Sequence, residues 1–123
     1  MTRRGPKQPS QRQRRVGELI RHALAGIFMR EDLRDPDLAD VSVTVTAVEM
    51  SPDLRLARAF ITPLGGVDPA PVVAGLNRCA PYLRRCLAGE VSLKYLPQLV
   101  FAADLSFDRA QRIERLLHRV RER

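Results

Sequence analysis

The chain has 123 residues, a formal net charge of +7 and no tryptophan, and 45% of its residues are hydrophobic. This length predicts a single domain with a modest core. No apolar stretch approaches the roughly 20 residues that span a bilayer, and no apolar segment follows the basic N-terminus, so we expect neither a membrane span nor a secretory signal but a cytoplasmic protein. Aromatic residues make up 5% of the chain, which argues against a base-stacking platform.

The N-terminal part of the chain is strongly basic. Six positive charges precede the first acidic residue, Glu18: Arg3, Arg4, Lys7, Arg12, Arg14 and Arg15. Gly5, Pro6 and Pro9 disfavour local order. We therefore predict a flexible basic arm over residues 1–12, one domain over residues 13–121 and a short C-terminal end at residues 122–123. Such an arm suits phosphate backbones, and the alternative is a solvated tail that only aids solubility.

The first half of the domain predicts one helix and a strand hairpin. Apolar residues at spacings of three and four predict an amphipathic helix over residues 11–29. Asp35-Pro36-Asp37 then interrupts the chain. Valines that alternate with polar residues predict a strand over residues 41–50, and Ser51-Pro52-Asp53 predicts the turn into a second strand over residues 54–61. These two strands should pair as an antiparallel hairpin.

A pair of short helices is predicted between residues 69 and 87, with Asp68 as the cap. Proline lacks an amide N–H and its ring collides with the carbonyl four residues back, so the helix should kink or restart at Cys79-Ala80-Pro81. The alternative is that Pro81 only marks the joint of a helical hairpin and has no functional role. Gly89 is expected to end this region.

A third strand starting near Pro97 and a last helix after Ser106 complete the predicted order, α-β-β-α-α-β-α. The connection between the second and third strands passes through helix, and this should leave those strands parallel. The predicted fold class is therefore α+β, with a three-stranded mixed sheet and helices on one face.

Catalytic chemistry is absent from the sequence. His22 and His118 stand apart, without neighbouring carboxylate or cysteine patterns. Cys79 and Cys86 would lie about 10 Å apart on a helix, too far for a disulfide. No phosphate-binding glycine loop, nucleophile elbow or metal-ligand spacing is present. We predict no enzyme, no metal site and no cofactor.

Four stretches carry a family resemblance: Arg15-Val16, Asp35-Pro36 through Val45, Ser51-Pro52-Asp53-Leu54, and Leu96-Pro97-Gln98-Leu99-Val100-Phe101 with Asp104, Ser106 and Arg112-Ile113. In these the chain resembles the ribosome-binding factor A family over about residues 12–117. The resemblance implies a type II KH-like fold in which a kinked helix junction, usually Ala-x-Gly, replaces the GxxG loop of other KH domains. This sequence contains no GxxG, and Cys79-Ala80-Pro81 stands at the junction.

The resemblance implies a non-catalytic, monomeric factor that binds free 30S subunits and 16S rRNA and promotes late 16S rRNA processing, with no small-molecule substrate and no membrane. Between Val72 and Ala103 the chain has one acidic residue, Glu90, so its basic residues are the first candidates for RNA contacts: Arg78, Arg84, Arg85 and Lys94. The six basic residues that precede Glu18 are second candidates: Arg3, Arg4, Lys7, Arg12, Arg14 and Arg15. Two alternatives stay open, a general KH-like binder of single-stranded RNA and a protein-interaction module.

Overall fold

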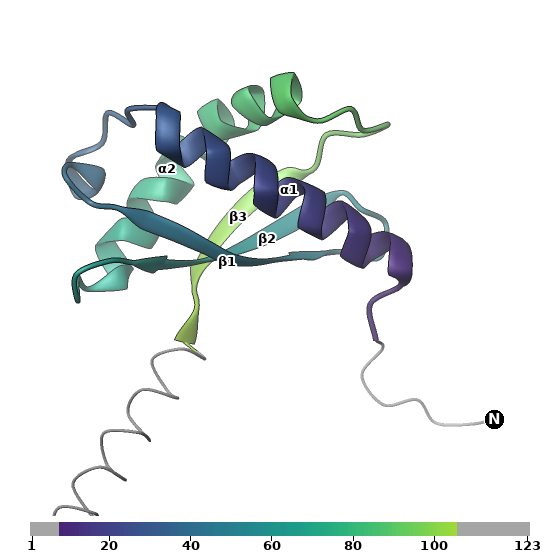
Figure 1. Cartoon of the computed structure of the whole chain (residues 1–123), viewed down its shortest axis with the longest axis horizontal. Coiled ribbons are helices and arrows are strands. Elements are labelled where there is room, and N and C mark those ends of the chain that lie inside the picture. Colours follow the sequence, from purple (N-terminus) through teal and green to yellow (C-terminus); the bar gives the residue numbers. More distant parts are fainter. Residues whose placement is uncertain (1–7, 106–123) are drawn as a thin grey trace, which may run out of the picture.

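The computed structural model describes residues 8–105, and Figure 1 shows a three-stranded sheet with two long helices on one of its faces. The elements are α1 (Gln11–Arg30), the short 3-10 helix η1 (Pro36–Leu38), β1 (Val43–Met50), β2 (Leu56–Pro63), α2 (Pro69–Glu90) and β3 (Gln98–Ala103). The predicted α+β class with a mixed sheet is confirmed. The predicted last helix lies outside the described residues.

Both strand pairings follow the prediction. β1 and β2 are antiparallel, with Met50 opposite Ala57. β2 and β3 are parallel, with Leu56 opposite Gln98. A parallel pair needs a long crossover connection, which α2 supplies. β2 is therefore the central strand, and β1 and β3 form the two edges of the sheet.

The hairpin between β1 and β2 closes around Ser51. Its carbonyl oxygen accepts the Leu54 N–H at 2.9 Å, and its own N–H donates to the Leu56 carbonyl at 2.9 Å. Oδ1 of Asp53 accepts the Ser51 hydroxyl at 2.6 Å and the Arg55 N–H at 3.1 Å. Leu54 has a φ of 62°, in the left-handed region that disfavours side chains. This residue therefore belongs to the turn, and β2 begins two residues later than predicted.

α1 begins with a capping box and then buries one face. The Ser10 hydroxyl accepts the Gln13 backbone N–H at 3.1 Å, and the Gln13 side chain accepts the Ser10 N–H at 2.8 Å. Ile20, Leu24 and Ile27 follow at helical spacing and are fully buried. The predicted amphipathic helix is confirmed to within one residue at its end.

Gly17 determines how closely α1 approaches β1. A Cβ atom at this position would lie 2.6 Å from the carbonyl oxygen of Val48, far inside van der Waals contact. Because the obstacle is backbone, no change of rotamer could relieve it. The backbone of α1 can therefore approach β1 here only because residue 17 has no side chain.

α2 is one helix where the sequence predicted two. It runs unbroken over Pro69–Glu90 with Pro81 inside it, and it also passes through Gly89. Asp68 caps it as predicted, accepting the Ala70 N–H at 3.2 Å. The proline removes one helical hydrogen bond, but it is exposed, and the buried stripe continues on both sides of it. The predicted separation into two helices is therefore wrong, and the order over residues 8–105 is α-β-β-α-β.

The core fills the space between the two helices and the face of the sheet that they cover. It consists of Ile20, Leu24, Ile27, Leu38, Val45, Met50, Ala57, Ala59, Ile61, Val72, Leu76, Leu83, Leu87, Leu99 and Phe101. Within residues 8–105 no polar or charged residue is buried. Any polar chemistry of the described part of the chain is therefore confined to its surface.

Gly17→Ala should lower the free energy of unfolding by about 1–3 kcal/mol, because the new methyl group forces α1 away from the sheet. Gly26→Ala is the matched control on the same helix. Its Cβ would meet only Nη1 of Arg30, at 3.5 Å, and alanine is the better helix former by about 1 kcal/mol. Urea unfolding followed by circular dichroism measures both variants. Unchanged stability in Gly17→Ala would contradict the close approach.

Candidate nucleic-acid interface

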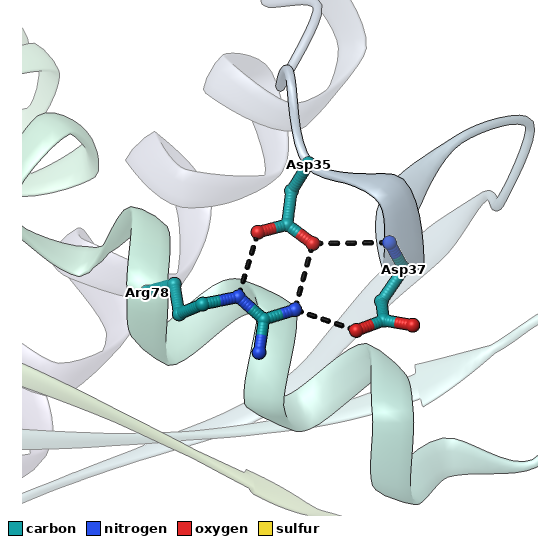
Figure 2. Close-up of polar contacts among 3 residues, drawn as sticks. All are labelled: Asp35, Asp37 and Arg78. Atoms are coloured by element: carbon teal, nitrogen blue, oxygen red, sulfur yellow. Dashed lines mark hydrogen bonds and ion pairs between the residues drawn. The ribbon is translucent and has the colours of Figure 1, made fainter.

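Arg78 projects from α2 and clamps the segment that joins α1 to β1. Its Nε donates to Oδ2 of Asp35 at 2.8 Å, and its Nη2 donates to Oδ1 of Asp35 at 2.8 Å and to Oδ2 of Asp37 at 2.6 Å. Figure 2 shows this fork of contacts. The Asp35 side chain is 9% exposed and that of Arg78 is 52% exposed. One guanidinium therefore holds two carboxylates from a distant part of the chain.

The local sequence explains why the clamp can form. Asp35 is the N-cap of η1 and accepts the Asp37 N–H at 3.0 Å, while Pro36 occupies the first position of that turn. Gly75 lies one helical turn before Arg78 on α2. A Cβ at Gly75 would lie 3.0 Å from Oδ1 of Asp35, so the absence of a side chain lets η1 rest against the helix.

The positive charge of Arg78 is balanced by two carboxylates of the same chain, those of Asp35 and Asp37. Hydrogen bonds from Arg78 hold the pKa of Asp35 down at about 2, and Asp35 and Asp37 raise the pKa of Arg78. A cation already matched by two carboxylates attracts phosphate less than an unpaired one. The structure therefore gives Arg78 an internal role, and its predicted contact with RNA stays a prediction.

The junction at Cys79, Ala80 and Pro81 lies on the middle of α2. Pro81 is exposed, while Cys79 and Ala80 are half-buried, and burial raises the pKa of the Cys79 thiol. Asn77 lies just before the junction and was not singled out in the sequence. Its side chain accepts the Phe101 N–H at 2.8 Å and donates to the Phe101 carbonyl at 3.1 Å, which covers part of the free edge of β3.

The Arg84 side chain also forms hydrogen bonds within the protein. Its Nε donates to the Pro97 carbonyl at 3.0 Å and its Nη2 to the Leu96 carbonyl at 2.8 Å. These bonds hold the segment that leads into β3 against α2. The side chain is half-buried, so Arg84 is a structural anchor as well as a candidate for RNA contact.

Arg85 and Lys94 are exposed, and each lies beside a tyrosine ring. Cζ of Arg85 is 5.7 Å from the ring centroid of Tyr82, and Nζ of Lys94 is 5.6 Å from that of Tyr95. The Tyr82 hydroxyl donates to Glu31, and this hydrogen bond raises the pKa of Tyr82 to about 12. Tyr82 and Tyr95 are themselves 42% and 53% exposed. The low aromatic content of the sequence did not reveal that these rings would be at the surface beside cations.

The three arginines of the first α1 turns, Arg12, Arg14 and Arg15, are exposed. α1 has no acidic residue in its first turn, although the helix dipole favours acids there. The positive potential at this end is therefore not offset within the first turn of the helix. Arg12 and Lys94 line the same groove, so the structure brings two predicted contacts together. Arg3, Arg4 and Lys7 lie outside the described residues.

Within residues 8–105, no group of three or more histidine, cysteine, aspartate or glutamate side chains could hold a metal ion. Cys79 and Cys86 are free. Among residues 8–105, no helix combines the length and the apolar character needed to cross a membrane.

Comparisons with known proteins show the family of the chain. The family model of ribosome-binding factor A matches residues 12–117. The chain belongs to the ribosome-binding factor A family. A ribosome-binding factor A from Maricaulis maris is 54% identical to it over 113 residues, which are 92% of this chain and 80% of that protein.

Solved structures of ribosome-binding factor A share the fold. The crystal structure from Thermus thermophilus superposes with a TM-score of 0.61 at 25% identity, covering 74% of this chain and 94% of that one. A homology model of the Thermus thermophilus factor, fitted into a cryo-EM map of a 30S complex, superposes with a TM-score of 0.60 at 24% identity, covering 76% of this chain and 96% of that one. The resemblance predicted from the sequence is therefore confirmed.

The clamp predicts an acid-dependent loss of stability. The pKa of Asp35 is about 2 in the folded protein against an ordinary value of 3.8, so the unfolded chain binds more protons as the pH falls. The stabilisation is complete above about pH 4 and is lost between pH 4 and pH 2. Arg78→Gln should lower the melting temperature at pH 7, and its difference from the unmodified protein should shrink over that pH range.

Arg85→Gln is the control for this measurement, because Arg85 is an exposed arginine of the same helix that contacts a ring instead of a carboxylate. Thermal unfolding followed by circular dichroism at pH 7, 4, 3 and 2 compares the three proteins. A gap between Arg78→Gln and the unmodified protein that stays constant down to pH 2 would show that Asp35 does not titrate through the clamp.

Proposed function

We propose that the protein binds free 30S ribosomal subunits through 16S rRNA and promotes late 16S rRNA processing during maturation of the small subunit. It acts in the cytoplasm as a monomer, and it holds RNA without catalysing a reaction. The observation that carries the proposal is membership of the ribosome-binding factor A family over residues 12–117. The Thermus thermophilus relative fitted into the map of a 30S complex supports the choice of subunit.

The distribution of charge supports RNA as the ligand. The chain carries a formal charge of +7, and six of its positive charges precede Glu18. On α2, Arg78 forms ion pairs with carboxylates of the same chain, and Arg84 donates to a backbone carbonyl group. Arg85 is exposed to solvent. Electrostatic attraction of such exposed cations to phosphates releases counterions and makes binding sensitive to salt.

Sucrose-gradient sedimentation of the tagged full chain with ribosomal particles from its own cells tests the proposal. We expect the protein to be enriched with free 30S subunits and absent from complete ribosomes. A protein that stays at the top of the gradient at both low and high salt would overturn the proposal. Affinity for short unstructured RNA equal to that for the 30S subunit would favour the general single-stranded RNA binder instead.

Arg85→Ala should weaken binding to 30S subunits and reduce the slope of log affinity against log salt by about 0.7–1, the value of one lost phosphate contact. Arg85→Lys keeps the charge and should keep the slope. Filter binding at several salt concentrations measures both. A slope unchanged by Arg85→Ala would remove Arg85 from the interface.

Arg84→Ala should destabilise the fold, unlike Arg85→Ala, because Arg84 donates to two backbone carbonyl groups. Losing these bonds should lower the free energy of unfolding by about 1–3 kcal/mol. Urea unfolding separates this loss of stability from a loss of RNA affinity. Full stability in Arg84→Ala would show that its carbonyl contacts contribute little.

A further inference from the structure

Three segments that are far apart in the sequence meet around one groove. The start of α1, the turn between β1 and β2, and the loop between α2 and β3 line a hollow of about 300 Å³. Figure 1 shows these three segments at the same end of the sheet. We call this hollow the Tyr95 groove, and its lining includes Arg12, Asp53, Lys94 and Tyr95.

The wall of the Tyr95 groove carries an accessible aromatic ring with cations around it. Tyr95 is 53% exposed. Cζ of Arg55 lies 4.9 Å from its ring centroid, and Nζ of Lys94 lies 5.6 Å from it. Such cation–ring contacts are weak at exposed sites, so a ligand with a flat ring of its own could share or displace them.

The charge of the groove favours an anion. Arg12 and Lys94 line the groove and Arg55 lies over the ring of Tyr95, which gives three positive charges around it, against one lining carboxylate, Asp53. Asp53 is already engaged, since its Oδ1 accepts the Ser51 hydroxyl and the Arg55 N–H, and these bonds lower its pKa. The carboxylate therefore stabilises the turn, and the cations around the groove exceed it by two charges.

The floor of the groove is apolar. Val16, Leu54 and Leu93 line it, and each packs partly buried against the core. A simple anion would use the cations and leave the ring and the apolar floor in water. An unpaired nucleotide uses both the ring and the cations, because its base stacks on an aromatic ring and its phosphate pairs with arginine or lysine.

We propose that the Tyr95 groove binds one unpaired nucleotide of RNA, with the base on the ring of Tyr95 and the adjoining phosphates on Arg12 and Lys94. This inference deepens the proposed function and rests on it. Only an unpaired base can stack on the ring, so the site selects single-stranded over paired RNA. Because every base can stack, the site has little sequence preference. The site lies at the opposite end of α2 from Asp68, beyond the last turn of that helix and apart from Cys79-Ala80-Pro81.

The tyrosine content of the chain allows a direct test of stacking. The chain has two tyrosines and no tryptophan, so Tyr82→Phe leaves Tyr95 as its one tyrosine fluorophore. We expect single-stranded oligouridine to quench this fluorescence saturably, because a stacked base quenches tyrosine. Inorganic polyphosphate, which offers phosphate without bases, should leave it nearly unchanged. No quenching by RNA, or equal quenching by polyphosphate, would overturn the proposal.

Substitutions in the full chain test how much the groove contributes to the affinity for single-stranded RNA. Tyr95→Leu should weaken binding of a labelled single-stranded RNA by about 5- to 150-fold, the range for loss of one stacked base, while Tyr95→Phe should stay within about twofold. Arg55→Gln removes the cation that lies over the Tyr95 ring and should weaken binding. Arg58→Gln changes an exposed arginine of the same region that is not among the cations over that ring, and it should not weaken binding. Thermal unfolding checks that each variant is folded.

The outcomes separate this inference from the proposed function. If Tyr95→Leu binds RNA as the unmodified protein does, the groove is not the nucleotide site, even when the protein still sediments with 30S subunits. If the unmodified protein fails to sediment with 30S subunits yet RNA quenches Tyr95, the proposed function fails and the groove still binds a nucleotide.

Discussion

The structure depends on α2 continuing as one helix through Pro81. Asn77 and Arg84 lie on either side of this proline, about two helical turns apart, which places them on one face of an unbroken helix. Asn77 bonds the backbone of Phe101 in β3, and Arg84 bonds the carbonyl groups that precede that strand. A restart at the proline would rotate one residue away from the other. A continuous α2 therefore lets Asn77 and Arg84 bond β3 and the segment before it while the apolar stripe of the same helix stays buried.

The same helix divides the basic residues into two groups. Arg78 pairs with Asp35 and Asp37, and Arg84 donates to backbone carbonyls, so these two cations serve the fold. Arg85 lies over a tyrosine ring, and both it and the arginines at the start of α1 are exposed to solvent. On α2, the positive charge that remains unpaired is therefore smaller than the number of its arginines indicates.

Much of the fold could be predicted, because its signals are local. The apolar spacing of α1, the turn at Ser51 and the cap at Asp68 each depend on residues close together in the sequence, and the structure contains all three. The predicted restart of a second helix at Pro81 failed, because burial on both sides of this residue outweighs its local cost. The functional surface was less predictable. In the sequence Arg78 resembles any free cation, because its partners lie 43 and 41 residues away.

The sequence by itself determined the family, the α+β class and the order of the strands, because periodicity, caps and turns are properties of neighbouring residues. Only the tertiary structure decided which cations remain free and which residues share a surface. The Tyr95 groove joins the start of α1 to a hairpin turn and to a loop near the other end of the described chain. Such a site exists only after the core has brought these segments together, and no spacing along the chain encodes it.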